Sequence, residues 1–427
     1  MEKKQLLSFM NVDLRDKVVL VRVDHNVVKK GKVKDTMRID ATFPTLLHIY
    51  RKGGKPIFMT HVGRPYDKKS GTITISEDDS VQPIVDYLKH KLSLQIEVPK
   101  LRVTDADGIT DLSELTAYVA KLKKGEMQLL YLPNTRWFKG EETKDEATET
   151  LAMELSRLAD VFINDAFGSW QPHVSTYGVT QYLPSYAGLL MEKEVAHLEE
   201  IFSPQRPFVA VVAGAKFDTK IGPLTSLLKM SDKLILGGVL YNAYLAAKYD
   251  ISINGLSDDD IALARKFLED AGPNLNKLVE LPYIVESDSM DSISEGSFRT
   301  RKISELTPGT KLNYVLDIGA ESFQEPAVRQ VISEAGTIFV NAVMGYTTLF
   351  KEGSQALYSL VNSNATAGKL FGGGDTIDEF KNLLPQVWLK AANDPSYYFF
   401  TGGGAILDAI EQGSPYAMKT VQALLRK

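Results

Sequence analysis

The chain of 427 residues contains no cysteine. This absence excludes a disulfide scaffold, a thiol nucleophile and a zinc site built from cysteine thiolates. The six histidines do not replace them, because no pair has the spacing of a metal site. A chain without cysteine fits a reducing compartment, and we expect a cytoplasmic protein.

Long apolar runs and strong charge of one sign are missing too. No run of about 18 apolar residues could cross a membrane, and residues 1–7 carry charges without the apolar segment of a signal peptide. The net charge is only −5, with lysines and arginines spread along the chain. We therefore expect no membrane association and no nucleic-acid partner. We also expect a monomer.

The chain does contain many short apolar runs, each ending in a polar or glycine-rich turn. Such runs, separated by amphipathic helices, are typical of buried parallel strands. In the first half the expected strands are 17–23, 56–60, 128–132 and 160–163, and the expected helices 39–51 and 147–158. In the second half the expected strands are 207–212, 233–236, 314–316, 337–340, 369–371 and 397–400.

This pattern predicts the α/β fold class, with two doubly wound, parallel-sheet (Rossmann-like) domains that face a cleft. The length also exceeds that of one ordinary domain. Right-handed crossovers bring all strand carboxyl ends to one edge of each sheet, where ligands bind. Ala187-Gly188 leads into an expected helix over 189–201, so we predict domains of residues 1–188 and 189–412.

The strand ends of the second half are rich in glycine. Glycine lets backbone N–H groups approach an anion, and a following helix adds its positive end. In the run 372–376 the amides could hold phosphate, Asp375 could bind magnesium and Thr376 could cap the helix. Lys216 and Lys220 could neutralise a transferring phosphoryl group. Tight helix packing is the alternative role for each single glycine turn.

The strand ends of the first half are basic and polar instead. They carry Asp24, Asn26, Arg38, His61, Arg64, Arg136 and Asn164-Asp165. Guanidinium groups match both phosphate and carboxylate, so this edge suits a small phosphorylated acid. A lone arginine is usually a surface charge, but three at one edge indicate a site. We expect the other histidines, including His173, to be surface or packing residues.

A colinear series of motifs resembles the phosphoglycerate kinase family over nearly the whole chain. In the first half these are RVDHNV at 22–27 (family RVDFNVP), DTMRI at 35–39, HVGRP at 61–65, NTRW with GEE at 134–142 and NDAFG at 164–168. They continue with MEKE at 191–194, GAK with KIG at 214–222, DIG at 317–319, GGGDT at 372–376 and TGGGA at 401–405.

The resemblance implies the phosphoglycerate-kinase fold and reversible transfer of a phosphoryl group between ATP and the carboxylate of 3-phosphoglycerate in glycolysis, with ADP and 1,3-bisphosphoglycerate as the other pair. The residues that it implies for acid binding are Asp24, Asn26, Arg38, His61, Arg64 and Arg136. Those implied for nucleotide binding are Lys216, Lys220, Gly319, Asn341, Gly373, Gly374, Asp375 and Thr376. Arg38 and Lys216 would be catalytic, Asp375 would bind Mg²⁺, and residues 413–427 would pack on the first domain.

Four positions depart from the family pattern. Residues 169–175 are one residue shorter than the usual TAHRAHAS and lack its arginine, which contacts the substrate. Thr348 stands where the family has a glutamate that binds ribose, and Val239 replaces a glycine. Asp218-Thr219 reverses the usual small-then-acidic order. The first departure concerns the acid, and the other three concern the nucleotide.

Three functions therefore stay open. The chain could be an active phosphoglycerate kinase, a weakly catalytic paralogue with a binding or regulatory role, or a kinase for another small acid. Arg38, Lys216 and Asp375 favour the first, whereas the altered arginine and ribose positions favour the second. A nicotinamide dehydrogenase is disfavoured, because no Gly-x-Gly-x-x-Gly motif follows a strand with an acidic residue about 20 positions later.

Overall fold

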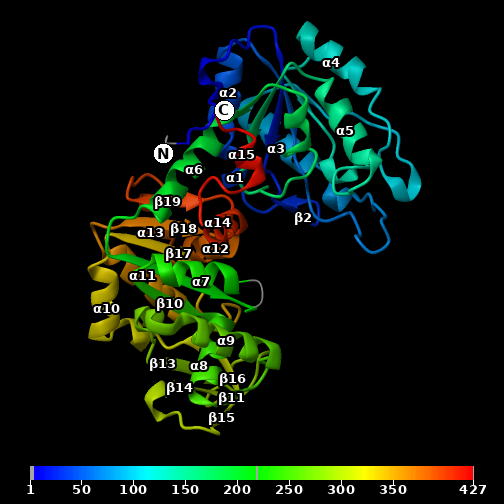
Figure 1. The fold of residues 1–427 in the computed structure, drawn as a ribbon. Coiled ribbons are helices and arrows are strands. Elements are labelled where there is room, and N and C mark those ends of the chain that lie inside the picture. The colour runs from blue at the N-terminus through cyan, green and yellow to red at the C-terminus, as the bar shows by residue number, and fades with distance from the viewer. Residues whose placement is uncertain (1–3, 218–219, 427) are drawn as a thin grey trace. The chain divides into compact units, whose positions relative to one another are not determined.

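The computed structural model describes residues 4–217 and 220–426. The chain divides into two compact units, which are labelled by element in Figure 1. Unit 1 consists of Met1–Val195 and Tyr416–Lys427, and unit 2 of Ala196–Pro415. The division falls inside helix α6 (Leu189–Phe202). In the part of the chain that is described, no helix combines the length and the apolar character needed to span a bilayer.

Unit 1 is built on a six-stranded parallel sheet in the order β5-β6-β4-β1-β7-β8. In that order the strands are Ile96–Glu97, Leu129–Tyr131, Lys55–Met59, Val18–Val23, Val161–Asp165 and Ser185–Ala187. The main helices around it are α2 (Phe43–Arg51), α3 (Gln82–Leu92), α4 (Leu115–Lys124) and α5 (Glu146–Ser156).

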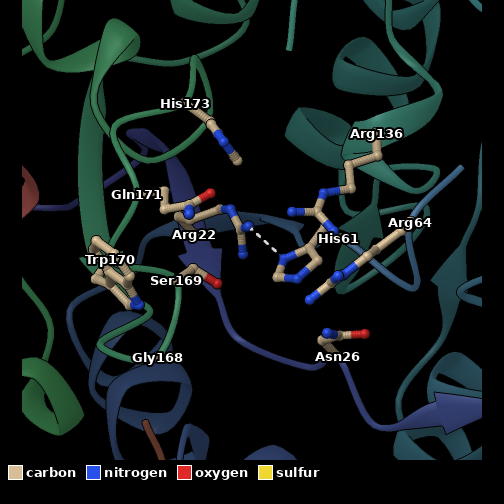
Figure 2. Close-up of a pocket in the computed structure, with 10 residues that line it drawn as sticks. All are labelled: Arg22, Asn26, His61, Arg64, Arg136, Gly168, Ser169, Trp170, Gln171 and His173. Atoms are coloured by element: carbon tan, nitrogen blue, oxygen red, sulfur yellow. Dashed lines mark hydrogen bonds between the residues drawn. The ribbon is translucent and has the colours of Figure 1, made fainter. Parts of the chain in front are cut away.

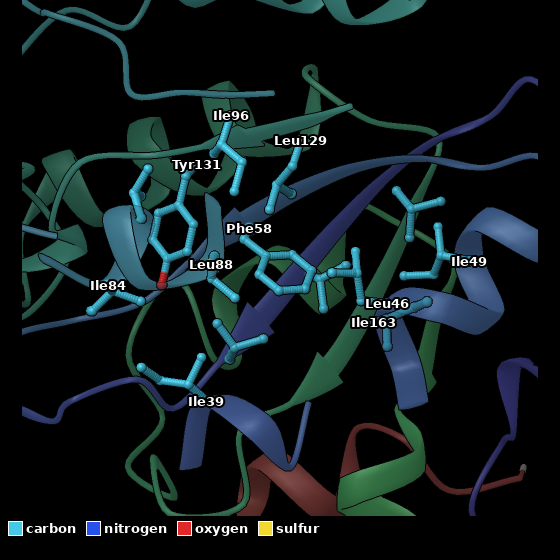
Figure 3. Close-up of a cluster of buried hydrophobic side chains, with 14 of the residues drawn as sticks. Ile39, Leu46, Ile49, Phe58, Ile84, Leu88, Ile96, Leu129, Tyr131 and Ile163 are labelled. Atoms are coloured by element: carbon cyan, nitrogen blue, oxygen red, sulfur yellow. The ribbon is translucent and has the colours of Figure 1, made fainter. Parts of the chain in front are cut away.

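Helices cover both faces of this sheet, which is why β1 is apolar along almost its whole length. Val19, Val21 and Val23 belong to a core that also contains side chains of α2 and α3. Figure 3 labels Leu46 and Ile49 of α2 and Leu88 of α3 in this core. Val18 and Leu20 point the other way, into a core with α4 and α5. A strand between two cores reads as a continuous apolar run, and all six residues of β1 are buried.

Unit 2 repeats the architecture with the order β12-β10-β9-β17-β18-β19, again all parallel. In that order the strands are Leu278–Val279, Lys233–Gly237, Phe208–Gly214, Thr337–Asn341, Gly368–Gly372 and Tyr397–Phe400. Its helices are α7 (Ile221–Met230), α8 (Gly238–Tyr249), α9 (Asp258–Ala271), α10 (Pro326–Ser333), α11 (Glu352–Ser363), α12 (Gly374–Leu383), α13 (Pro385–Ala391) and α14 (Gly403–Glu411). The predicted fold class is confirmed.

The expected strand 314–316 is present, but it does not belong to the parallel sheet, so its predicted place in that sheet is wrong. It forms β16 (Tyr314–Ile318), which pairs antiparallel with β13 (Tyr283–Ser287). The third strand of this small sheet is β14 (Phe298–Lys302). Its arginines Arg299 and Arg301 bond the buried Glu286 of β13. Because these charged residues interrupt any apolar run, the sequence pattern did not predict this hairpin.

The expected helix 39–51 is also interrupted. It forms α1 (Met37–Asp40) and α2, and Pro44 lies in the first turn of α2. Proline has no N–H to donate and favours the first turn of a helix, so a new helix begins there. The interruption leaves Arg38 on a separate short helix.

The end of the chain lies against its beginning, within unit 1. The short helix α15 (Lys419–Gln422) is followed by a segment that pairs with residues near the N-terminus. The N–H of Leu7 donates to the carbonyl of Leu424 at 2.7 Å, and that of Arg426 to Gln5 at 2.9 Å. Residues 413–415 belong to unit 2.

Candidate active site

A cavity of about 200 Å³ opens at the carboxyl ends of neighbouring strands in unit 1 (Figure 2). The loops after β1, β4, β6 and β7 supply most of its wall. Because the strands are parallel, segments far apart in the sequence meet at this edge. The lining residues are Arg22, Asn26, His61, Arg64, Arg136, Gly168, Ser169, Trp170, Gln171 and His173.

Four of the predicted acid-binding residues line this cavity, namely Asn26, His61, Arg64 and Arg136. Both the amide of Asn26 and the guanidinium of Arg136 bond the backbone of Gly63, at 3.1 and 2.5 Å. Nε of Arg136 also lies 3.1 Å from a carboxylate oxygen of Glu142. The loop after β4 and the ion pair thus fix the direction of one guanidinium.

The other two predicted residues, Asp24 and Arg38, lie outside the wall of the cavity but form an ion pair of 3.3 Å with each other. Asp24 is almost fully buried, and Arg38 is partly exposed. The positive charge of Arg38 helps to lower the pKa of His61. Arg38 is therefore close to the cavity without lining it.

Both histidines of the cavity are neutral near pH 7. Burial, together with Arg22 and Arg136, holds the pKa of His61 well below its usual value. Burial and the same two arginines lower the pKa of His173 to about 4. The positive charge of the wall therefore comes from the guanidinium groups of Arg22, Arg64 and Arg136.

Arg22 and His173 are cavity residues that sequence reasoning missed. His173 was expected on the surface or in packing, and that prediction is wrong because it lines the cavity. Arg22 lies inside β1 and is only 1% exposed. A charged residue in an otherwise apolar, buried strand has to be paired or functional, so the run VVLVRV already held a signal for Arg22.

In unit 2, the carboxyl ends of three adjacent strands are joined by side-chain hydrogen bonds. The amino group of Lys220 donates to the carbonyl of Ala213, near the end of β9, at 2.9 Å and to Oδ1 of Asn341, the last residue of β17, at 2.7 Å. Nδ2 of Asn341 donates to the carbonyl of Gly372, at the end of β18, at 2.6 Å. Burial lowers the pKa of Lys220 to about 8, opposed by the charge of Asp375.

The glycine turn after β18 leads directly into α12. Gly373 has a φ of 104°, and a Cβ there would lie 2.8 Å from Nδ2 of Asn341. Gly374, Asp375 and Thr376 form the first turn of the helix, whose N–H groups have no partners within the helix. This turn can bind an anion such as phosphate.

Asp375 is the predicted metal ligand. Within the described residues, no group of three or more histidine, aspartate or glutamate side chains could hold an ion. One carboxylate beside an anion-binding turn nevertheless fits magnesium, which proteins often hold through one or two carboxylates plus the phosphates of a substrate. The donors present are therefore compatible with an ion carried by a nucleotide.

The remaining predicted nucleotide residues are more scattered. Gly319 follows β16 in the antiparallel sheet, where its N–H donates to Tyr283 at 2.9 Å, so it does not lie on the parallel edge as expected. Lys216 is exposed on the loop after β9. The departure at Asp218-Thr219 lies outside the described residues.

Thr348, which replaces the glutamate of the family pattern, is exposed on the loop after β17. The hydroxyl of its neighbour Thr347 donates to Oε1 of Glu379 at 2.9 Å. Glu379 comes from α12, the helix that begins at the glycine turn. The structure thus places a carboxylate beside this loop from a different element. Val239, the other departure, lies in the first turn of α8.

Comparison with known proteins gives a consistent result. The phosphoglycerate kinase family model matches residues 9–413. Phosphoglycerate kinase from Roseiflexus sp. (strain RS-1) is 33% identical over 410 residues, which cover 95% of this chain and 96% of the relative. The enzyme of that name from Chlamydia trachomatis serovar D is 34% identical over 420 residues, or 96% of each chain.

Solved structures are similar over the whole length. The phosphoglycerate kinase of Coxiella burnetii has a TM-score of 0.75 and 27% identity, and the match covers 98% of this chain and 99% of that one. The structure from Pyrococcus horikoshii OT3 has a TM-score of 0.77 at 20% identity, with 98% of each chain covered, and supports the fold alone.

Proposed function

The chain belongs to the phosphoglycerate kinase family, and from this premise we propose how its two units share the transfer of a phosphoryl group between ATP and the carboxylate of 3-phosphoglycerate. Unit 1 binds the acid and unit 2 binds the nucleotide. The cavity with three guanidinium groups in its wall is the observation that carries this proposal.

The acid has an anionic group at each end, which is the chemistry that Arg22, Arg64 and Arg136 recognise. His61 and His173 add neutral imidazoles. Neutral donors can bond a hydroxyl or an oxyanion without adding charge. The small volume and basic wall favour a compact phosphorylated acid over a larger substrate.

The nucleotide phosphates are assigned to the glycine turn and to Lys220. The free N–H groups of α12 point along the helix axis, and the lysine adds a positive charge beside them. Asp375 would hold magnesium, which neutralises phosphate charge when bound. Gly319, Asn341 and Thr376 complete the predicted set. The monomeric state predicted from the sequence stays a prediction.

The transferring phosphoryl group is assigned to Arg38 and Lys216. Its charge spreads over three oxygens in the transition state, so preorganised cations lower the barrier. Asp24 holds Arg38 by the 3.3 Å ion pair. We expect Lys216→Ala to lower kcat by about 10²–10³-fold in a steady-state assay, while Lys266→Ala, on the exposed surface of α9, leaves it unchanged.

A coupled assay with 3-phosphoglycerate, magnesium and a panel of nucleotides tests the whole proposal. Turnover with 3-phosphoglycerate is the expected result. Phosphorylation of other small acids, with none of 3-phosphoglycerate, would identify a kinase of different specificity. Binding of both ligands without turnover would favour a binding or regulatory role instead.

A further inference from the structure

Arg22 is held in the acid cavity by a chain of hydrogen bonds that runs deep into unit 1. Nε of Arg22 donates to the hydroxyl oxygen of Ser175 at 2.8 Å. The Ser175 hydroxyl in turn donates to Oε1 of Glu141, and the Ser175 N–H donates to Oε2 of the same carboxylate at 2.9 Å. The three residues come from β1, from the loop after β7 and from the segment after β6.

The far side of the guanidinium is fixed as well. One terminal nitrogen of Arg22 lies 3.0 Å from Nδ1 of His61, the contact drawn in Figure 2, and the other donates to the carbonyl of Val23. Arginine has no acceptor, so Nδ1 of His61 must be the acceptor and the proton of this neutral ring is on Nε2. The orientation of Arg22 is thus fixed from both sides.

The three residues joined by these hydrogen bonds are all buried, so the charge of Arg22 depends on the partners that the hydrogen bonds provide. Arg22 is 1% exposed, Glu141 2% and Ser175 0%. A buried charge without a partner costs several kcal/mol, so this arginine and this carboxylate depend on each other. The Ser175 hydroxyl accepts from one and donates to the other, so it sets the direction of the guanidinium as well as joining the two charges.

The loop that provides Ser175 is also the loop that departs from the family pattern. Residues 169–175 lack the arginine expected there, yet Trp170, Gln171 and His173 of this loop line the cavity. The loop therefore contributes no charge of its own to the wall, although its last residue bonds an arginine of β1 that does.

We propose that Ser175 and Glu141 are positioning residues that hold the guanidinium of Arg22 in the wall of the acid cavity, where it binds an anionic group of the substrate in place of the arginine that loop 169–175 lacks. This inference rests on the proposed function of unit 1. It differs from a purely structural role, because a structural role predicts lost stability without a selective loss of acid binding.

The first test is the affinity of Ser175→Ala for 3-phosphoglycerate, measured by calorimetry on the full chain. Loss of one hydrogen bond to a charged group should weaken binding by about 10-fold or more. KM for the acid should rise in the same proportion, whereas kcat and the affinity for magnesium-ATP should change less than about twofold. Ser231→Ala is the matched control, because it removes another buried hydroxyl, one that bonds Leu227 at 2.7 Å in unit 2.

The second test is Glu141→Gln, which preserves size but removes one of the two acceptor oxygens. Burial raises the pKa of Glu141 to about 7, opposed by Arg22 and increased by the neighbouring Glu142. Around Arg22, the other charged or titratable groups are Asp24, His25, His61, Tyr131, Arg136 and His173. The ionised carboxylate accepts both bonds from Ser175, so in the wild type acid affinity should fall as pH falls from 8 to 6.

In Glu141→Gln that fall should be smaller. The substrate phosphate itself titrates near pH 6, but it does so equally in both proteins, so the difference between them isolates Glu141. Unchanged acid affinity in a folded Ser175→Ala, or in Glu141→Gln if the first variant does not fold, would overturn the proposal. Failure of the wild type to bind 3-phosphoglycerate would instead reject the proposed function, and with it the role of this pair.

Discussion

Asp375 is one exposed carboxylate in the first turn of α12, close enough to Lys220 for its charge to raise that lysine's pKa against the effect of burial. At the residue scale, this position predicts a role limited to the nucleotide. Asp375→Ala should weaken binding of magnesium-ATP by about 10-fold or more, because a charged ligand of the ion is lost. Binding of 3-phosphoglycerate should not change.

Calorimetry with each ligand separately checks this prediction. Asp378→Ala, one turn further along α12 and exposed, is the control for loss of a carboxylate on the same helix. Equal affinity of Asp375→Ala and the wild type for magnesium-ATP would remove the assignment of the metal to Asp375.

Thr348 gives a second prediction at the residue scale. A neutral hydroxyl bonds ribose more weakly than a carboxylate does, so we expect the chain to discriminate poorly between ATP and 2′-deoxy-ATP. Thr348→Glu should increase the affinity for ATP by about 10-fold and the affinity for the deoxy analogue by less. Competition binding with the two nucleotides measures both effects.

Glu379 is the control in this experiment, because its carboxylate already lies beside the loop through its 2.9 Å bond with Thr347. If the wild type strongly prefers ATP over the deoxy form and Glu379→Gln abolishes the preference, then Glu379 holds the ribose and the interpretation of Thr348 is wrong. Poor discrimination between ATP and 2′-deoxy-ATP in both the wild type and Glu379→Gln supports the interpretation of Thr348.

At the scale of elements, the turn between β18 and α12 depends on one backbone conformation. A side chain at Gly373 would strain the backbone at a φ of 104° and meet Asn341, which holds Lys220. Gly373→Ala should therefore destabilise the protein by about 1–3 kcal/mol and weaken nucleotide binding.

Gly368→Ala provides a matched control for that change. Gly368 begins the same strand, a Cβ there would meet nothing within 4 Å, and its φ is not in the positive range. Thermal unfolding and nucleotide titration of the two variants measure the effect. Similar behaviour of both would show that the turn tolerates a side chain.

Sequence patterns predicted the long buried strands but not the short or amphipathic ones. Runs such as 17–23 correspond to β1 because both faces of that strand are covered. The two-residue strands β5 and β12 are too short to show a pattern. The antiparallel pairing of β16 depends on partners more than ten residues away, and an apolar run of three residues does not encode their direction.

The site was predicted in the same uneven way. Residues on loops after strands, such as Asn26 and Arg136, follow from the rule that ligands bind at strand ends. Arg22 escaped this rule because it lies within the strand itself. His173 was missed because its place in the cavity wall depends on how its loop folds. In that fold the N–H of Ser175 bonds Glu141, a contact between distant parts of the sequence.

At the scale of the whole molecule, each unit contains a buried aspartate that accepts backbone N–H groups at the start of a helix. In unit 1, Asp165 bonds Leu190 and Met191 of α6. In unit 2, Asp317 bonds the N–H of Gly353 in α11 at 2.9 Å. Burial raises the pKa of both carboxyls to about 7.

These raised pKa values predict how stability depends on pH. Between about pH 4 and pH 7 the folded state retains protons that the unfolded state has released, so each group lowers the free energy of unfolding as pH rises. As pH rises from about 4 to 7, the free energy of unfolding of the wild type should therefore fall relative to that of Asp165→Asn. Denaturant titrations at pH 4.5, 6 and 8 measure it, and a difference independent of pH would contradict the prediction.

The pairing of Leu7 with Leu424 and of Gln5 with Arg426 has a consequence for how the protein is made. A ribosome synthesises a chain from its N-terminus, so every residue of unit 2 is added before residues 416–426 are made. Unit 1, although begun first, cannot form these backbone hydrogen bonds until residues 424 and 426 have been synthesised. The unit that is synthesised first is therefore the one that receives its last backbone hydrogen bonds after the other unit has been made.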